Sequence, residues 1–145
     1  MGASAVDVVA FRVGARHFGI PVAQVDQVFP VAEITPLAGA PEPVRGLVTI
    51  AGTATPVVDL QRRLEGRWSE LRLHQRLILV GASSRRFALL ADDVAGVTSL
   101  SEAALADASG PTDYGFIYTR LCDVAGLLSA AEEAQLAAAL QQCPA

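Results

Sequence analysis

Apolar residues in this chain come in short runs that alternate with turn-forming residues. The run AVDVVAFRV at residues 5–13 is followed by a glycine and then by HFGI, a pattern that predicts a β-hairpin. Similar strand, turn and strand patterns lie at residues 44–60, around Ala51-Gly52, and at residues 76–91. Short strands separated by turns at regular intervals indicate a mostly β protein, built as a barrel or a sandwich.

The segments between these strands have a different character. Valines recur at helical spacing in residues 22–29, which predicts a short helix or helical turn, with a strand as the alternative. Residues 35–43 contain three prolines and one glycine, so a surface loop is expected there. The polar stretch at residues 60–73 is predicted to be a loop that begins with a helical turn.

Two helices are predicted in the last third of the chain. Residues 92–97 are expected to end or bend the preceding strand, and a weakly capped helix is predicted over residues 99–107. Ser129 and Glu132 have the spacing of a capping box and precede a run rich in Ala and Leu. This pattern predicts a C-terminal helix at residues 130–142.

Length and composition favour one domain in the cytosol. A chain of 145 residues is long enough for one core, with a two-lobed form as an alternative. No apolar run reaches the roughly 18–20 residues of a membrane helix. The N-terminus lacks the pattern of a secretory signal, and Cys122 and Cys143 are interpreted as reduced thiols. We therefore expect a cytoplasmic protein that does not insert directly into a membrane.

Charge is spread unevenly along the chain, although the formal net charge is only −4. Residues 61–86 contain seven arginines and two glutamates, a local charge of +5, whereas residues 87–145 have a local charge of −7. This asymmetry suits an electrostatically steered protein partner better than a nucleic acid, for which an overall basic domain is expected. The alternative is that both segments are simply solvated surfaces.

The sequence contains no recognisable catalytic or metal-binding arrangement, and no cofactor is expected. Gly-rich phosphate loops and lysine are both absent from the sequence, and His17 and His74 lack the spacing of a metal site. Asp92 and Asp93 face opposite sides of a strand, so one is expected to face solvent and the other to satisfy a backbone turn. Cys122 is interpreted as a buried thiol. The sequence therefore favours binding over catalysis.

Four stretches of the chain match one known pattern. They are FRVGARHFGIPVAQVDQV, TPLAGAPEPVRGLVTIAGTATPVVDL, LLADDVAGVTSLSEAAL and CDVAGLLSAAE, and together they extend from about Val8 to Glu132. In these stretches the chain resembles the CheW-like adaptor proteins of bacterial chemotaxis. The resemblance implies a single CheW-like domain at residues 1–145 with its core at about residues 6–129. This domain would fold as two packed SH3-like five-stranded β-barrel subdomains with short connecting helices. It also implies a non-enzymatic scaffold that couples a chemoreceptor's cytoplasmic tip to the regulatory domain of a CheA-type histidine kinase.

The resemblance also implies roles for individual residues. Gly46 is interpreted either as a position where a side chain would hold the partner off or as relief of a backbone conformation. Asp59 and Asp92 match acids of the family pattern, and a structural role is favoured for both. The implied partner contacts are Val25, Gln27, Arg45, Gly46, Ala51 and Gly52, and the implied structural motif positions are Pro56, Asp59 and Asp92.

Two departures from the family pattern affect these expectations. The family usually displays an arginine before the turn glycine, where this chain has Ala51. If that arginine contacts a partner, its loss costs about 1.5–3 kcal/mol of binding free energy. The segment between Tyr114 and Cys122 is also short, so the second barrel is expected to be incomplete or to pair its strands differently. An exposed edge there would be a candidate dimer surface.

Three functions remain open from the sequence. The leading one is the coupling scaffold, in chemotaxis or a related pathway such as surface motility, recruited to membrane-associated receptor arrays. A second is a CheW-like protein that lost the receptor contact and binds other CheW-like domains or itself. The third is a β-barrel that binds a small ligand, which would require an apolar cavity with convergent polar groups.

Overall fold

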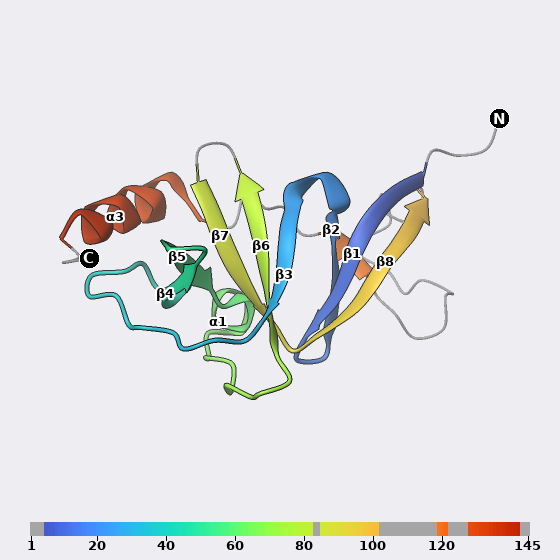
Figure 1. The fold of residues 1–145 in the computed structure, drawn as a ribbon, viewed down its shortest axis with the longest axis horizontal. Helices are drawn as coiled ribbons and strands as arrows, with labels where there is room; N and C mark the ends of the chain where they lie inside the picture. The colour runs from blue at the N-terminus through green and yellow to red at the C-terminus, as the bar shows by residue number, and fades with distance from the viewer. Residues whose placement is uncertain (1–4, 83–84, 102–118, 122–127, 143–145) are drawn as a thin grey trace.

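The chain forms two β-sheets with a helix at one end (Figure 1). The structure is a computed structural model and describes residues 5–82, 85–101, 119–121 and 128–142. One sheet has the strand order β8-β1-β2-β9, with β1 at Ala5–Val13, β2 at Arg16–Pro21, β8 at Asp93–Ser101 and β9 at Thr119–Leu121. The other has the order β3-β6-β7-β5-β4, with β3 at Val25–Pro30, β4 at Val44–Ile50, β5 at Thr53–Val58, β6 at Arg76–Ala82 and β7 at Arg85–Ala91.

Three helical segments connect or follow these strands: η1 at Val22–Gln24, α1 at Leu60–Glu65 and α3 at Ala130–Gln141. The mostly β class and the C-terminal helix were predicted from the sequence, and both are confirmed. The described residues supply five strands to one sheet and four to the other, while closure of the sheets into barrels stays a prediction.

Most of the predicted elements are also confirmed. The three hairpins pair in register as β1 with β2, β4 with β5, and β6 with β7. Residues 22–29 are mainly strand, because only Val22–Gln24 makes a helical turn before β3 begins. The strand β7 ends before a bend at Asp92, as predicted. The next strand, β8, begins at Asp93 and runs to Ser101, so the prediction of a helix beginning at residue 99 was wrong. The remainder of that predicted helix, Tyr114 and both cysteines lie outside the described residues.

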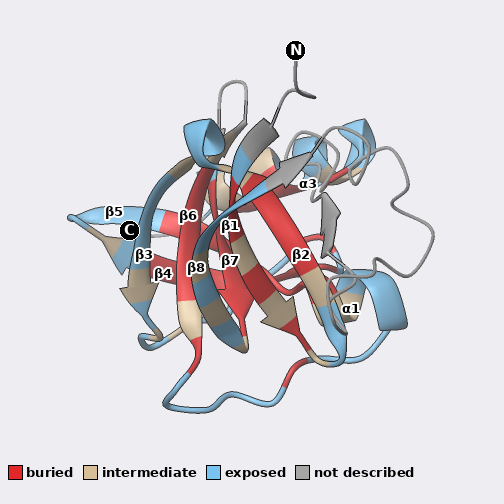
Figure 2. Cartoon of the chain, turned by 90° about the vertical axis from the view of Figure 1, so that its right-hand side faces the viewer, coloured by how far each residue is buried: buried red, intermediate tan, exposed pale blue. Residues whose placement is uncertain are grey.

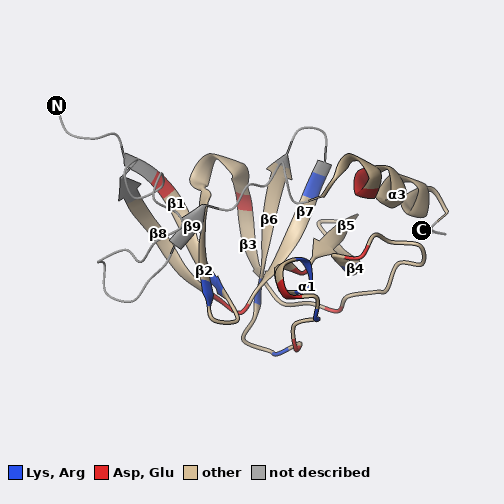
Figure 3. Ribbon diagram, turned by 180° about the vertical axis from the view of Figure 1, so that it is seen from behind, with Lys and Arg blue, Asp and Glu red and all other residues tan. Residues whose placement is uncertain are grey.

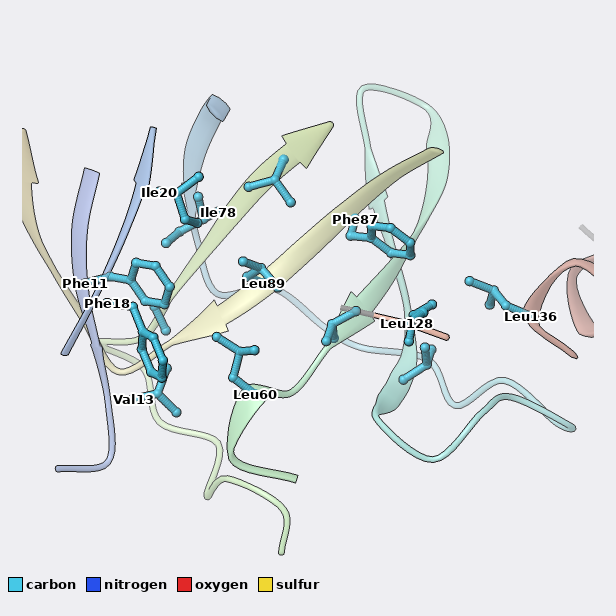
Figure 4. Packing of buried hydrophobic residues seen from close by; sticks show 14 residues of the cluster. Phe11, Val13, Phe18, Ile20, Leu60, Ile78, Phe87, Leu89, Leu128 and Leu136 are labelled. Atoms are coloured by element: carbon cyan, nitrogen blue, oxygen red, sulfur yellow. The ribbon is translucent and has the colours of Figure 1, made fainter. Parts of the chain in front are cut away.

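One core joins the two sheets. Phe11, Phe18 and Ile20 from the four-stranded sheet pack with Ile78 and other apolar residues of the five-stranded sheet (Figure 4). Buried positions run along β6 and β7, whereas most of β3 is exposed (Figure 2). Successive residues of β5 and β7 alternate between this core and a second cluster on the other face of their sheet. The second cluster contains Val48, Val57, Leu77, Ala88 and Leu90.

Helix α3 begins at the predicted capping box and covers one end of the core. Ser129 Oγ accepts a hydrogen bond from the Glu132 N–H at 3.1 Å, and the Glu132 carboxylate accepts one from the Ser129 N–H at 2.9 Å. Leu136 from the middle of the helix is fully buried in the shared core (Figure 4). Burial of one leucine side chain contributes about 1.5–3 kcal/mol, which holds the helix against the sheets.

Candidate partner-binding groove

The β4–β5 hairpin closes through a two-residue turn at Ala51 and Gly52. Both residues have positive φ angles, 51° and 79°, as a type I′ turn requires. The flanking residues Ile50 and Thr53 are paired across the hairpin. Alanine rarely adopts this backbone region, because its Cβ approaches the following carbonyl oxygen. The turn is exposed and therefore presents backbone and one methyl group, where the family usually displays an arginine.

A groove of about 610 Å³ lies beside this turn. Its walls come from β3 and β5, although β6 and β7 separate these strands in the sheet, so the sheet curves around the groove. Exposed Gln27 and Ala51 line it together with Pro56. Gln27 and Ala51 are implied partner contacts from two separate stretches of the sequence, whereas Pro56, from the same stretch as Ala51, was predicted as a structural motif position. Phe29, Ile50 and Leu140 add apolar surface to the same groove.

The groove carries little unpaired charge among its described residues. Asp26 from β3 and Arg86 from β7 both line it, and the Arg86 Nε atom lies 3.1 Å from the Asp26 carboxylate. Both side chains are largely exposed, so the pair contributes only about 0–1 kcal/mol to folding. The groove therefore offers mainly shape and apolar contact to a partner.

Arg45 has an internal role that the sequence did not predict. Its Nη1 atom donates to the Asp59 carboxylate at 2.9 Å and to the Ser69 carbonyl oxygen at 2.8 Å. Its guanidinium carbon also lies 5.4 Å from the centre of the Trp68 ring. Because these contacts occupy the guanidinium group, Arg45 lies outside the groove and supports the segment that follows α1.

Asp59 is the centre of this internal network. Its carboxylate is completely buried and caps α1 by accepting hydrogen bonds from the Gln61 N–H at 3.0 Å and the Arg62 N–H at 3.3 Å. The same carboxylate accepts hydrogen bonds from the Ser69 N–H and hydroxyl, each at 2.9 Å. The structure thus gives Asp59 a structural role, as a buried carboxylate whose hydrogen bonds and ion pair offset its desolvation.

Gly46 lies where another segment of backbone crosses β4. A Cβ atom at this position would lie 2.3 Å from the Thr35 carbonyl oxygen, far inside contact distance. That oxygen accepts a hydrogen bond from the Leu47 N–H at 2.7 Å, and the Thr35 N–H donates back to Leu47 at 2.8 Å. The glycine is therefore required by a close approach within the chain, and its φ of 159° agrees with the interpretation as relief of a backbone conformation.

The remaining predicted positions lie in other places. Val25 is half-buried and packs against the shared core, so it does not line the groove. Asp92 accepts a hydrogen bond from the Gly14 N–H at 2.6 Å and another from the Gln75 amide at 2.9 Å, whereas Asp93 is exposed. This agrees with the prediction that one acid of the pair satisfies a turn and the other faces solvent.

Sequence reasoning missed the groove contributions of Phe29, Arg86 and Leu140. Leu140 belongs to the predicted C-terminal helix, but nothing in the local sequence shows which sheet surface that helix contacts. Within the described segments, no helix is long and apolar enough to span a membrane. No group of three potential metal ligands forms in this part of the chain either.

Comparison with known proteins shows that the chain is similar to CheW-like proteins in both sequence and fold. The family model described as a CheW-like domain matches residues 7–128. Over 96 residues the chain is 29% identical to the chemotaxis protein CheW of Rhizobium meliloti (strain 1021), covering 66% of this chain and 62% of that protein. Over 89 residues it is 30% identical to protein PilI of Pseudomonas aeruginosa, covering 61% of this chain and 50% of that protein.

The matches span between half and just under two thirds of the length of these two relatives. The fold is similar to the crystal structure of the scaffolding protein TtCheW from Thermoanaerobacter tengcongensis. The TM-score is 0.71 at 19% identity, covering 90% of this chain and 92% of the other. Because the family model matches most of its length, the chain belongs to the CheW-like family.

Proposed function

We propose that this chain is a non-enzymatic scaffold that couples a chemoreceptor's cytoplasmic tip to the regulatory domain of a CheA-type histidine kinase. The pathway is chemotaxis or a related chemosensory response, and the protein works in the cytoplasm at receptor arrays. One observation carries the proposal. The groove brings together Gln27 and Ala51, two positions from separate segments of the sequence for which the family resemblance implied partner contact.

The form of the groove suits a helical protein partner. Its lining includes exposed residues of β3 and β5, so a ligand in it would stay in contact with solvent along one side. Small-molecule sites usually enclose most of their ligand, whereas an amphipathic helix needs only an open apolar groove. Phe29, Ile50 and Leu140 supply apolar surface for such a helix. Binding alone would then position the kinase relative to the receptor.

Calorimetry with two separate fragments tests the coupling function: a receptor cytoplasmic-tip hairpin and a CheA-type regulatory domain. We expect each to bind with a Kd of roughly tens of micromolar or lower, in the range of transient signalling contacts. Ala54→Trp fills the groove at an exposed position and should weaken receptor binding. Ala95→Trp, at an exposed position of β8, is the matched control and should leave it unchanged. Absence of binding to both fragments would overturn the coupling function.

Self-assembly without a receptor contact is the second candidate, because Ala51 removes the charge that the family usually displays. Ala51→Arg separates the two candidates. Restoring a charged hydrogen bond is expected to tighten receptor binding about tenfold. If neither the natural chain nor Ala51→Arg binds the receptor fragment while the chain associates with itself, the second candidate is correct.

A further inference from the structure

A second exposed surface lies in the segment that joins α1 to β6, at the opposite end of β6 and β7 from the groove (Figure 1). Its apolar side chains are exposed, and Leu73 is 94% exposed. Arginines gather at this end of the molecule, on α1, on the connecting loop and at the adjacent ends of β2 and β6 (Figure 3). We call it the loop surface and define it by Leu64, Arg67, Trp68, Leu71, Arg72 and Leu73.

The side chains of the loop surface stand on a segment that is held in place from beneath. Gln75 is completely buried, its Oε1 atom accepts a hydrogen bond from the Arg72 N–H at 2.7 Å, and its Nε2 atom donates to the Glu70 carbonyl oxygen at 2.8 Å. Ser69 is fastened to Asp59 at the other end of the same loop. The backbone that carries Leu71 and Leu73 is therefore fixed at both ends.

Trp68 is held in a similar way. The guanidinium carbons of Arg45 and Arg62 lie 5.4 and 5.1 Å from the centre of its ring, within the range of cation–π contact. Arg62 is in turn paired with Glu42 at 2.8 Å. A partly exposed tryptophan whose position is already fixed loses little side-chain entropy on binding, and tryptophan and arginine are enriched among the residues that dominate interface energies.

The charges of this surface define the chemistry of its partner. Arg67 is 72% exposed at the side chain, and its nearest described carboxylate, that of Glu65, lies 3.8 Å away. Arg72 is paired with Glu70 at 2.7 Å but is also mostly exposed. Both arginines border a hollow of about 470 Å³ beside Trp68, which Arg12 and His74 also line, together with the acids Glu70 and Asp92. A partner carboxylate in this hollow would meet donors from more than one side.

We propose that the loop surface is a second docking surface, separate from the groove, for an acidic protein segment that carries leucine or aromatic side chains. The apolar side chains of the partner would cover Trp68, Leu71 and Leu73, while its carboxylates would pair with Arg67 and Arg72. A protein partner fits better than an anionic bilayer, because the Glu70 side chain is 80% exposed among the arginines. A flat anionic surface would be repelled there, whereas a folded segment avoids that one position.

Fluorescence anisotropy with three labelled helical peptides of about sixteen residues tests this surface. The first has leucine on one face and Asp and Glu elsewhere, the second replaces its acids by lysine, and the third replaces its leucines by serine. We expect only the first to bind, with affinity that falls as salt is raised. Leu73→Ser should weaken this binding about tenfold or more, because an exposed hot-spot side chain is removed. The double variant Arg67→Ala and Arg72→Ala should have a similar effect.

The control has matched chemistry at an exposed apolar position outside both surfaces. Val97→Ser on β8 should leave peptide binding unchanged. Equal binding of all three peptides, or no binding, would overturn the proposal, as would an unchanged affinity in the Leu73→Ser chain. Cosedimentation with phosphatidylserine vesicles without peptide binding would identify a membrane surface instead. Self-association that requires Leu73 would identify a second copy as the occupant, and both of these results also contradict the proposal.

Discussion

The groove and the loop surface are supported in different ways. The groove is built mainly on strands, whose backbone hydrogen bonds fix its shape, so its exposed wall can consist of small residues such as Ala51 and Ala54. The loop surface has no such ladder beneath it, and two completely buried polar side chains, Asp59 and Gln75, hold it in place. An irregular segment lacks the regular backbone pairing of a strand, so side chains satisfy more of its buried backbone groups. The loop surface should therefore depend on single buried residues far more than the groove does.

The largest expected effect follows from removing the carboxylate beneath the loop surface. Asp59→Ala removes the carboxylate that pairs with the Arg45 guanidinium and accepts a hydrogen bond from the Ser69 N–H, and it also uncaps α1. The free energy of unfolding should fall by about 3 kcal/mol or more, as for a broken buried ion pair. Trp68 emission should shift to longer wavelength in the folded protein. Denaturant titration followed by tryptophan fluorescence measures both changes.

Asp93→Ala is the matched control, because it removes an exposed carboxylate. Its effect should stay within about 0.5 kcal/mol. Equal stability of the Asp59→Ala and Asp93→Ala chains would contradict the claim that the loop surface depends on single buried polar residues.

The next largest effect is expected on the strand that carries the groove. Gly46→Ala places a Cβ atom against the Thr35 carbonyl oxygen and should displace the segment that crosses β4. Overpacking of this kind costs about 1–3 kcal/mol, measured as a lower midpoint of thermal unfolding. Gly81→Ala in β6 is the control, since nothing lies within 4 Å of its added Cβ. If both variants unfold at the same temperature, the close approach at Gly46 does not constrain the fold.

A smaller change in stability, a gain instead of a loss, is expected at the Ala51-Gly52 turn. Ala51→Asn places a residue that tolerates left-handed backbone at a φ of 51° and creates the Asn-Gly pair favoured in type I′ turns. Stability should rise by up to about 1 kcal/mol, because alanine pays for its Cβ in this conformation. Ala54→Asn, in the extended part of β5, should instead lower stability slightly. A gain of equal size at both positions would show that turn geometry is not the cause.

The smallest change in stability is expected at the ion pair between helices α1 and α3. Glu132 of α3 is paired with Arg63 of α1 at 2.8 Å. The Ser129 N–H hydrogen bond, and then the charge of Arg63, hold the pKa of Glu132 below its usual 4.5 despite partial burial. Because the folded pKa is depressed, this stabilisation is present above pH 4.5 and is lost as pH falls through the folded value.

Glu132→Gln keeps the capping hydrogen bonds but loses the ion pair, so it should cost about 0.5 kcal/mol at pH 7. Urea titrations at pH 7 and pH 3.5 should show a smaller pH dependence for this variant than for the natural chain. Glu133→Gln alters an exposed neighbouring carboxylate and provides the control. An identical loss of pH dependence in both variants would exclude the Arg63 pair as its source.

Local patterns were enough to predict most of the elements. Alternating apolar residues and turn signals predicted the hairpin of β4 and β5, because side-chain period and turn chemistry act over a few residues. The capping box predicted the start of α3 for the same reason. The strand β8 was missed, since Gly96 and two acids resemble a chain break until pairing with β1 supplies their partners. Pairing between distant segments is not encoded in either one alone.

The residues of the candidate site were predicted only in part, and there is a physical reason why some were predicted and others were not. The family pattern implied partner contacts at Gln27 and Ala51, which both line the groove, but it also included Arg45, whose guanidinium group turns inward to Asp59. Sequence alone cannot give the direction of an arginine side chain, because exposed and internal partners compete for the same group. Leu140 was missed because its contact depends on how α3 packs.

By itself, the sequence determined the mostly β class, the hairpins, the capped C-terminal helix and the bare turn at Ala51. Each of these depends on residues close together in the chain, whose spacing and backbone preferences act locally. Only the tertiary structure decided that Gly46 allows the backbone at Thr35 to approach closely and that Arg45 pairs with the buried Asp59. The exposure of Leu73 was also decided only there. These outcomes depend on atoms from distant segments meeting within a few ångströms, which local spacing does not specify.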